Sequence, residues 1–79
     1  MSEMMNTDER LIYMANQIAA FFAAQGETRA VAGIADHIEK FWTPRMRHDL
    51  IALAKKDSSR FQAHVHAAIK QVAAAQAAG

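Results

Sequence analysis

The sequence predicts an all-α fold, a small bundle of three to four short helices. Apolar residues recur at three- and four-residue spacing in every long segment, as one face of a helix requires, and no stretch alternates as a strand would. Helix-capping residues stand between these segments. The 79 residues are 52% hydrophobic, which suits one small domain rather than a disordered chain. We therefore expect a single domain over 1–79, with frayed ends at 1–6 and 73–79.

The first helix is expected to begin near Thr7 or Asp8. Asn6, with Glu9 three residues later, has the pattern of a capping box. Gly26 marks the end, because glycine adopts the left-handed cap conformation without a steric penalty. The predicted apolar stripe consists of Leu11, Ala15, Ile18 and Phe22, with Met14 and Phe21 beside it.

The second helix is expected over residues 28–41. Phe41 continues its apolar face and is predicted to lie in the core, whereas Trp42 is predicted to be partly exposed at the helix junction. Gly33 lowers helix propensity by roughly 1 kcal/mol relative to alanine, and we interpret it as a point where another backbone approaches. The core face is predicted to hold Val31, Ile34, Ile38 and Phe41.

Thr43 and Pro44 predict that the third helix follows with almost no loop. Threonine is a good N-cap, and proline fits the first helical position because its missing N–H would be unpaired there. Asp57, with the serines after it, predicts a polar break before the fourth helix. The third stripe is Met46, Leu50 and Leu53, and the fourth is Phe61, Val65, Ala68 and Val72.

Several functional classes are disfavoured by composition. The chain has no cysteine, so we expect no thiolate metal site. Its first residues are acidic and polar, unlike a signal peptide, and no uncharged apolar run approaches the ~20 residues that span a bilayer. We therefore expect no membrane segment and a soluble, cytoplasmic protein, and its formal net charge of +1 gives no general attraction to nucleic acid or membranes. The four histidines lack metal-ligand spacing, and no nucleophile completes a catalytic set. We therefore expect no catalytic residue, bound cofactor or metal in this chain.

The charges are unevenly divided along the chain. Residues 1–42 carry six acidic and three basic side chains, a net of −3, and residues 43–79 carry two acidic and six basic ones, a net of +4. A small helical nucleic-acid-binding module is the alternative that this basic half suggests. We favour a solvated surface, because the third helix lacks the several Arg, Asn or Gln side chains of a recognition helix.

The first helix has no charged residue from Leu11 to Gly26. A helix packed on one side normally carries charge on the other, so this neutral face suits a surface covered by a partner. An ordinary neutral helix face explains the pattern equally well. If the face is a docking surface, the isolated chain is expected to form a weak two-fold dimer through it. The face consists of Tyr13, Asn16, Gln17, Ala20 and Ala24.

Two blocks, MANQIAAFFAAQ at 14–25 and VAGIADHIEKFWTPRMR at 31–47, closely resemble the delta subunit of cytoplasmic NAD-dependent formate dehydrogenases. The family usually has Asp where this chain has Thr43, and both residues cap helices. The resemblance implies a large alpha subunit with molybdenum pterin and iron–sulfur clusters, and further subunits with FMN and clusters that reduce NAD. It also implies that the delta subunit has no cofactor and assists assembly, cofactor insertion or stability of the alpha subunit.

The residues expected to contact that large subunit come from the neutral face and the helix junction. Arg45 and Arg47 diverge at the start of a helix, so they cannot both bind one small anion. We expect at least one to contact carboxylates or carbonyls of the partner. The predicted partner-binding set is Tyr13, Asn16, Gln17, Ala20, His37, Trp42, Arg45 and Arg47.

Overall fold

The computed structural model describes residues 6–78, and these residues form an all-α fold, as the sequence predicted. Residues 1–5 and Gly79, parts of the two ends expected to fray, lie outside the described residues. The α-helices are α1 (Thr7–Phe22), α2 (Glu27–Phe41), α3 (Pro44–Lys56) and α4 (Ala63–Ala78), and the short 3-10 helices are η2 (Ala23–Gln25) and η3 (Ser58–Arg60).

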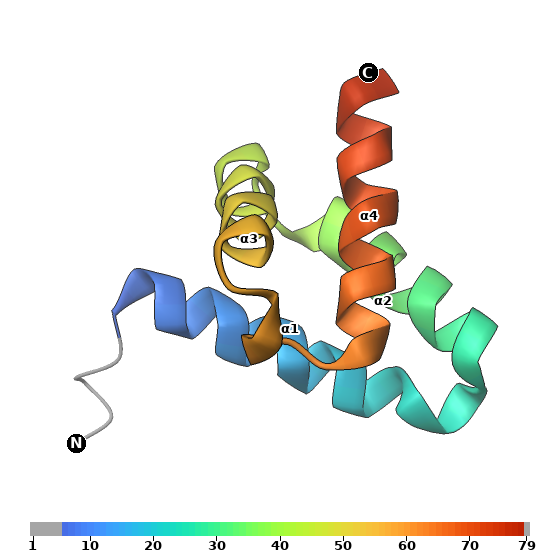
Figure 1. Ribbon diagram of the computed structural model, residues 1–79. Helices are drawn as coiled ribbons and strands as arrows, with labels where there is room; N and C mark the ends of the chain where they lie inside the picture. The colour runs from blue at the N-terminus through green and yellow to red at the C-terminus, as the bar shows by residue number, and fades with distance from the viewer. Residues whose placement is uncertain (1–5, 79) are drawn as a thin grey trace.

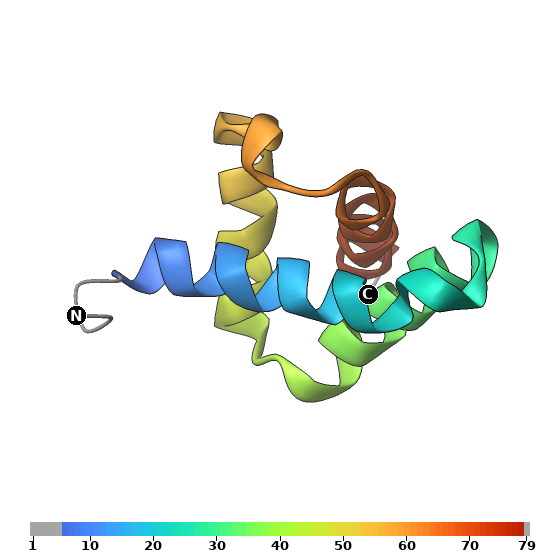
Figure 2. The ribbon, with the colours of Figure 1, turned by 90° about the horizontal axis from the view of Figure 1, so that it is seen from below.

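The helices cross one another steeply instead of forming a parallel bundle. Helix α1 runs along the base in Figure 1, and α4 rises from it. Seen from below in Figure 2, α3 crosses α1 while α4 is viewed along its axis. Helix α4 packs mainly against α2, and α2 also packs against α1. A radius of gyration of 11.9 Å is about that of a compact chain of this length.

The core lies where the apolar stripes of the four helices meet. Small side chains on α1, Ala15 and Ala19, are completely buried and let neighbouring helices come close. No polar or charged side chain is buried among residues 6–78. The largest side chains that are completely buried are Ile34, Ile38, Leu50, Val65 and Val72.

The predicted starts of α1 and α3 are confirmed by their hydrogen bonds. The Asn6 side chain accepts from the Glu9 backbone N–H at 2.8 Å, and the Asn6 N–H donates to the Glu9 side chain at 3.1 Å. Thr43 Oγ1 accepts from the Met46 N–H at 3.1 Å, and proline follows it at the first helical position. These caps satisfy N–H groups that the helices cannot satisfy themselves.

Gly26 separates α1 from α2 with a positive φ of 91°, but its ψ is 152°. The predicted helix stop is therefore an extended link that only glycine adopts readily, and not a left-handed helical cap. The same residue acts as the N-cap of α2, so one glycine both ends the η2 turn and starts the next helix.

The predicted burial of Phe41 and Trp42 is wrong, because the structure reverses it. Trp42 is only 5% exposed and belongs to the core, whereas Phe41 is 72% exposed. Helix α2 ends at Phe41, and Trp42 has extended backbone angles of φ −95° and ψ 143°. This break changes the direction of the Trp42 side chain, so extrapolating the helical stripe past Ile38 selected the wrong aromatic residue.

Gly33 does permit a close approach, but of a side chain instead of a backbone. A Cβ atom at this position would lie 2.6 Å from Cδ1 and 2.7 Å from Cε1 of Phe22. The missing side chain therefore makes room for the Phe22 ring between α1 and α2.

Candidate docking surface

Phe21, Phe41 and Tyr13 are the large apolar side chains that the fold leaves most exposed. They are 75%, 72% and 52% exposed. Tyr13 and Phe21 lie on α1, eight residues apart, and therefore on one side of that helix. Phe41 is the last residue of α2.

A series of contacts joins these residues into one surface. The Gln17 side-chain amide donates to the Tyr13 hydroxyl at 3.1 Å. Gln17, Phe21 and His37 line a common hollow of about 340 Å³ between α1 and α2. The rings of His37 and Phe41 follow, with their centroids 4.8 Å apart. We call Tyr13, Gln17, Phe21, His37 and Phe41 the aromatic surface.

Packing between α1 and α2 explains why Phe21 faces outward. The Phe22 ring occupies the space left open by Gly33, and consecutive helical residues point in different directions. Phe21 therefore lies on the outside of the same helix end. The two phenylalanine rings meet edge to face, with centroids 5.1 Å apart and an interplanar angle of 87°. The partly buried Phe22 ring supports the exposed Phe21 ring in this arrangement.

A charged pair lies on α2 beside the aromatic surface. Lys40 Nζ is 3.2 Å from Asp36 Oδ2, and both side chains are more than half exposed. These two residues immediately precede Phe41 and His37 in the sequence. An apolar centre beside such polar groups has the anatomy of a protein–protein interface.

Of the eight residues predicted to bind a partner, Tyr13, Gln17 and His37 belong to the aromatic surface. Ala20 is exposed on α1. Asn16 lies half-buried and holds the η3–α4 connection. Its amide donates to the Arg60 carbonyl at 3.0 Å, and its Oδ1 accepts from the Gln62 N–H at 3.1 Å. Asn16 thus fixes a distant part of the chain.

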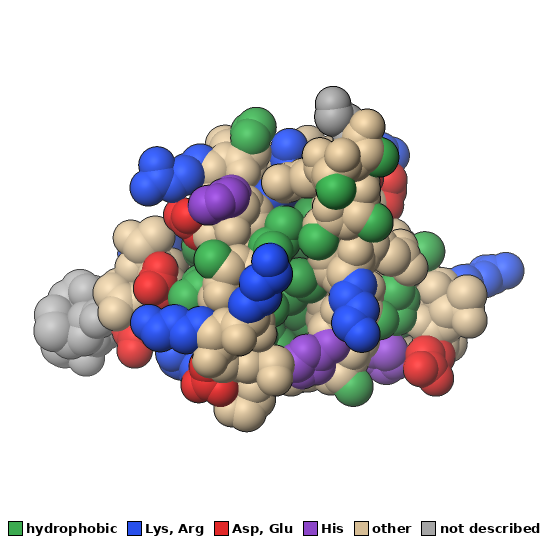
Figure 3. Space-filling view, turned by 45° about the horizontal axis from the view of Figure 1, so that its top comes forward, with side chains coloured by type: hydrophobic (Ala, Val, Ile, Leu, Met, Phe, Trp, Pro, Cys, Tyr) green, Lys and Arg blue, Asp and Glu red, His purple; other side chains and the backbone are tan. Residues whose placement is uncertain are grey.

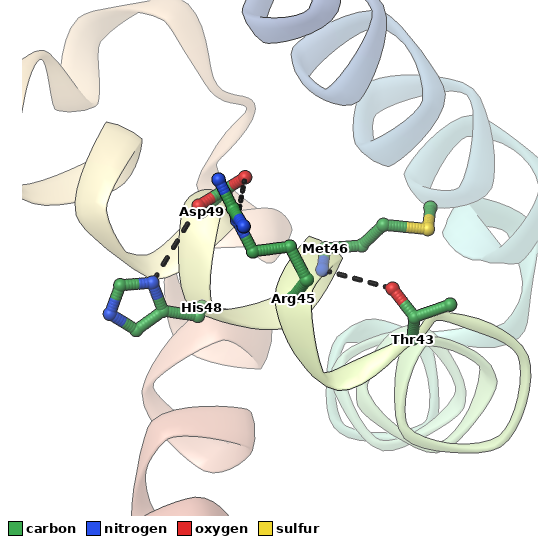
Figure 4. Close-up of polar contacts among 5 residues, drawn as sticks. All are labelled: Thr43, Arg45, Met46, His48 and Asp49. Carbon is green, nitrogen blue, oxygen red and sulfur yellow. Dashed lines mark hydrogen bonds and ion pairs between the residues drawn. The ribbon is translucent and has the colours of Figure 1, made fainter.

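The two arginines diverge, as their spacing predicted. Arg45 is exposed, with Nε 3.3 Å from Asp49 Oδ2 one turn along α3 (Figure 4). His48 Nδ1 lies 3.6 Å from the other Asp49 carboxylate oxygen. The exposed Arg45–Asp49 pair contributes little to stability, so the guanidinium remains accessible to a partner.

Arg47 instead turns toward the end of α2. Its Nη1 donates to the Trp42 carbonyl at 2.6 Å and to the Glu39 carbonyl at 3.3 Å. Its Nε donates to Gln76 Oε1 of α4 at 3.1 Å. Carbonyls at a helix C-terminus lack helical partners and favour cations. Arg47 therefore ties the start of α3 to the end of α2 and to α4.

Sequence reasoning missed Phe21 and Phe41 as surface residues. Phe21 could have been found, because it lies four residues after Gln17 on the uncharged side of α1. Phe41 could not be separated from Trp42 by spacing, since both fit a continuation of the α2 stripe. The deciding factor was the backbone break after Phe41.

Among residues 6–78, no group of three His, Cys, Asp or Glu side chains is placed to hold a metal ion. None of the described helices has the length and apolar character needed to cross a membrane.

Comparison with known proteins gave one family. Residues 10–69 match the family model described as NADH-dependent formate dehydrogenase delta subunit FdsD. This range contains the whole aromatic surface, all of α2, and α1 from its fourth residue onward. No curated protein and no solved structure matched the chain.

Proposed function

The chain belongs to the delta-subunit family of NADH-dependent formate dehydrogenases, and on that premise we propose that it is a non-catalytic accessory subunit. It docks on the large, cofactor-bearing subunit of a cytoplasmic enzyme and assists the assembly, cofactor insertion or stability of that subunit. The molybdenum pterin, iron–sulfur clusters, FMN and NAD site would all be held by the partner subunits.

The exposure of Phe21 and Phe41 is the observation that carries this proposal. Two phenylalanines with about three quarters of their surface in water are costly unless another molecule covers them. A typical interface buries about 800 Å² on each partner. That is roughly 15% of this chain's 5206 Å² surface, so a contact of typical size centred on these rings would still leave most of the chain uncovered.

The remaining candidate residues have different roles in the proposal. Tyr13, Gln17 and His37 complete the contact around the two phenylalanines, and Ala20 allows close approach on α1. Arg45 extends the contact to α3 through its exposed guanidinium. Asn16, Trp42 and Arg47 support the surface indirectly by holding the helices in place.

Co-purification of the large subunit with charged variants tests the docking surface. Phe21→Asp and Phe41→Asp should each weaken association at least about tenfold, since buried aromatic anchors dominate interface energies. Ala74→Asp, at an exposed position of α4, introduces the same charge on a helix outside the aromatic surface and should leave association unchanged. Each variant should melt within about 4 °C of the wild type, because both phenylalanines are exposed in the free chain.

Two results would contradict different parts of the proposal. If the wild-type chain does not associate with the large subunit, the accessory role itself is wrong. If the wild type associates and both phenylalanine variants do so equally well, docking uses another surface. Molybdenum content of the large subunit, expressed with and without the chain, separates a role in cofactor insertion from a role in stability alone.

The isolated chain should also form a weak two-fold dimer through the same uncovered surface. A dimer would bury the apolar rings against their symmetry mates. Sedimentation at increasing concentration measures it, and Phe21→Asp should shift the equilibrium to monomer. A strict monomer at high concentration would mean that the surface is adequately hydrated without a partner.

A further inference from the structure

A second apolar hollow lies between α3 and α4, on helices that contribute no residue to the aromatic surface. It has a volume of about 520 Å³ and is lined by Ile51, Ala54, Lys55, Ile69, Lys70 and Ala73, with Ser58 and His66 at its edge. Figure 3 shows hydrophobic side chains at its floor, with Lys and Arg side chains to either side. We call this feature the α3–α4 groove.

The groove is open in part because each of the two helices places a small residue in its lining. Helix α4 packs mainly on α2, which leaves its side toward α3 only partly covered. Ala54 and Ala73 are half-buried and too short to fill the space, and Ile51 is half-buried above the core. Apolar side chains of another molecule could therefore gain burial here without displacing any part of the fold.

The charge at the groove has one sign. Lys55 from α3 and Lys70 from α4 are both exposed, and no acidic side chain lines the groove. Among residues 6–78, neither lysine forms an ion pair, whereas Lys40 and Arg45 each have a carboxylate partner. Two unpaired cations bordering an apolar floor favour a ligand that is apolar in the centre and acidic at its edges.

The length of the groove indicates the shape of that ligand. Its lining spans residues 66–73 on α4, about 12 Å or two helical turns, and residues 51–55 on α3, with Ser58 of η3 beyond the end of that helix. This length matches an apolar stripe at positions i, i+3 or i+4, and i+7 of a docked helix. We propose that the α3–α4 groove binds an acidic amphipathic helix of a partner polypeptide, with its apolar stripe on the floor and its carboxylates beside Lys55 and Lys70.

A pair of synthetic helical peptides tests this binding on the full chain. Both peptides carry leucine at i, i+3, i+4 and i+7; one has glutamates on both flanks and the other has lysines. NMR titration of the labelled chain should show saturable binding of the glutamate peptide, with amide shifts concentrated at 51–58 and 66–73. The lysine peptide should bind about tenfold more weakly or worse, since two attractive pairs become two repulsive ones.

Matched charge reversals identify the lysines responsible. The Lys55→Glu/Lys70→Glu variant should reverse the preference between the peptides. The Lys40→Glu/Lys56→Glu variant changes the net charge by the same amount, from +1 to −3, at exposed lysines that do not line the groove. It should retain the wild-type preference. An equal effect of the two variants would indicate general attraction and overturn the proposal.

Other outcomes would overturn it as well. These are no saturable binding of the glutamate peptide, shifts concentrated on the aromatic surface, or tighter binding of a DNA duplex at the same residues. Because the titration uses the chain alone and a different surface, its result is independent of whether Phe21 and Phe41 dock on the large subunit. Failure of one proposal can therefore be distinguished from failure of the other.

Discussion

Replacing Arg47 with alanine should destabilise the free chain, although the side chain is charged and lies at the surface of a helix junction. The Arg47 guanidinium donates hydrogen bonds to three acceptors: the Glu39 and Trp42 carbonyls at the end of α2, and Gln76 Oε1 of α4. Without it, the carbonyls at the end of α2 lose their only side-chain donor among the described residues. The hydrogen bond from α3 to Gln76 of α4 is lost with it.

The magnitude follows from the bond lengths and burial. The hydrogen bond from Arg47 to the Trp42 carbonyl is 2.6 Å long and partly buried, and it is the strongest of the three. A hydrogen bond to a charged group contributes about 1.5–3 kcal/mol. The other two bonds are exposed, and the one to Glu39 is long at 3.3 Å, so they add little. We expect a loss of about 2 kcal/mol from a total stability of roughly 4–12 kcal/mol. The melting temperature should fall by about 8–16 °C.

Thermal and urea unfolding of Arg47→Ala, Arg47→Lys and Arg45→Ala measure this effect. Arg47→Lys should recover only part of the loss, because an ammonium group cannot reproduce the planar fork. Arg45→Ala is the matched control: the Arg45 side chain is 84% exposed and pairs only within α3, so the substitution should change stability by about 0.5 kcal/mol or less. Equal melting temperatures for the Arg45 and Arg47 variants would refute the structural role assigned to Arg47.

Three further substitutions test other parts of the fold. Trp42→Ala should cost about 3–5 kcal/mol, as expected for a buried aromatic; a circular-dichroism melt near wild type would contradict its place in the core. Asn16→Ala should cost about 1–2 kcal/mol by leaving the Gln62 N–H and the Arg60 carbonyl without their partner, and hydrogen exchange at Gln62 should accelerate. Gly33→Ala should destabilise despite better helix propensity, because the new Cβ meets the Phe22 ring at 2.6 Å; a more stable Gly33→Ala variant would mean that the ring moves aside freely.

The parts of the fold that sequence predicted are those determined within one turn of a helix. The Asn6–Glu9 capping box and the Thr43–Pro44 helix start depend on residues at most three positions apart. Stripe residues such as Ile34 and Leu50 follow from helical periodicity alone. These features do not depend on how the helices pack against one another, so they can be predicted from the sequence without the tertiary contacts.

The candidate site was predicted less well, because tertiary contacts decide which of the residues stay on the surface. Asn16 and Gln17 are adjacent amide residues on one uncharged helix, and composition gave them the same expected role. In the structure Asn16 bonds to residues 44 and 46 positions away, whereas Gln17 bonds within its helix and stays on the surface. No local pattern contains the η3–α4 connection that makes this difference.

The junction FWTPRMR shows how one backbone break assigns opposite roles to neighbouring residues of similar chemistry. The chain leaves the helical conformation at Trp42 and re-enters it at Pro44, so Phe41 stays outside while Trp42 enters the core. The same break exposes the Trp42 carbonyl, and Arg47 is placed to bind it, whereas Arg45 faces water. One backbone break therefore accompanies both the burial of the tryptophan and the capping by Arg47. Of the two aromatic residues and two arginines in this junction, Phe41 and Arg45 are the exposed ones, and they are the ones that the proposed docking uses.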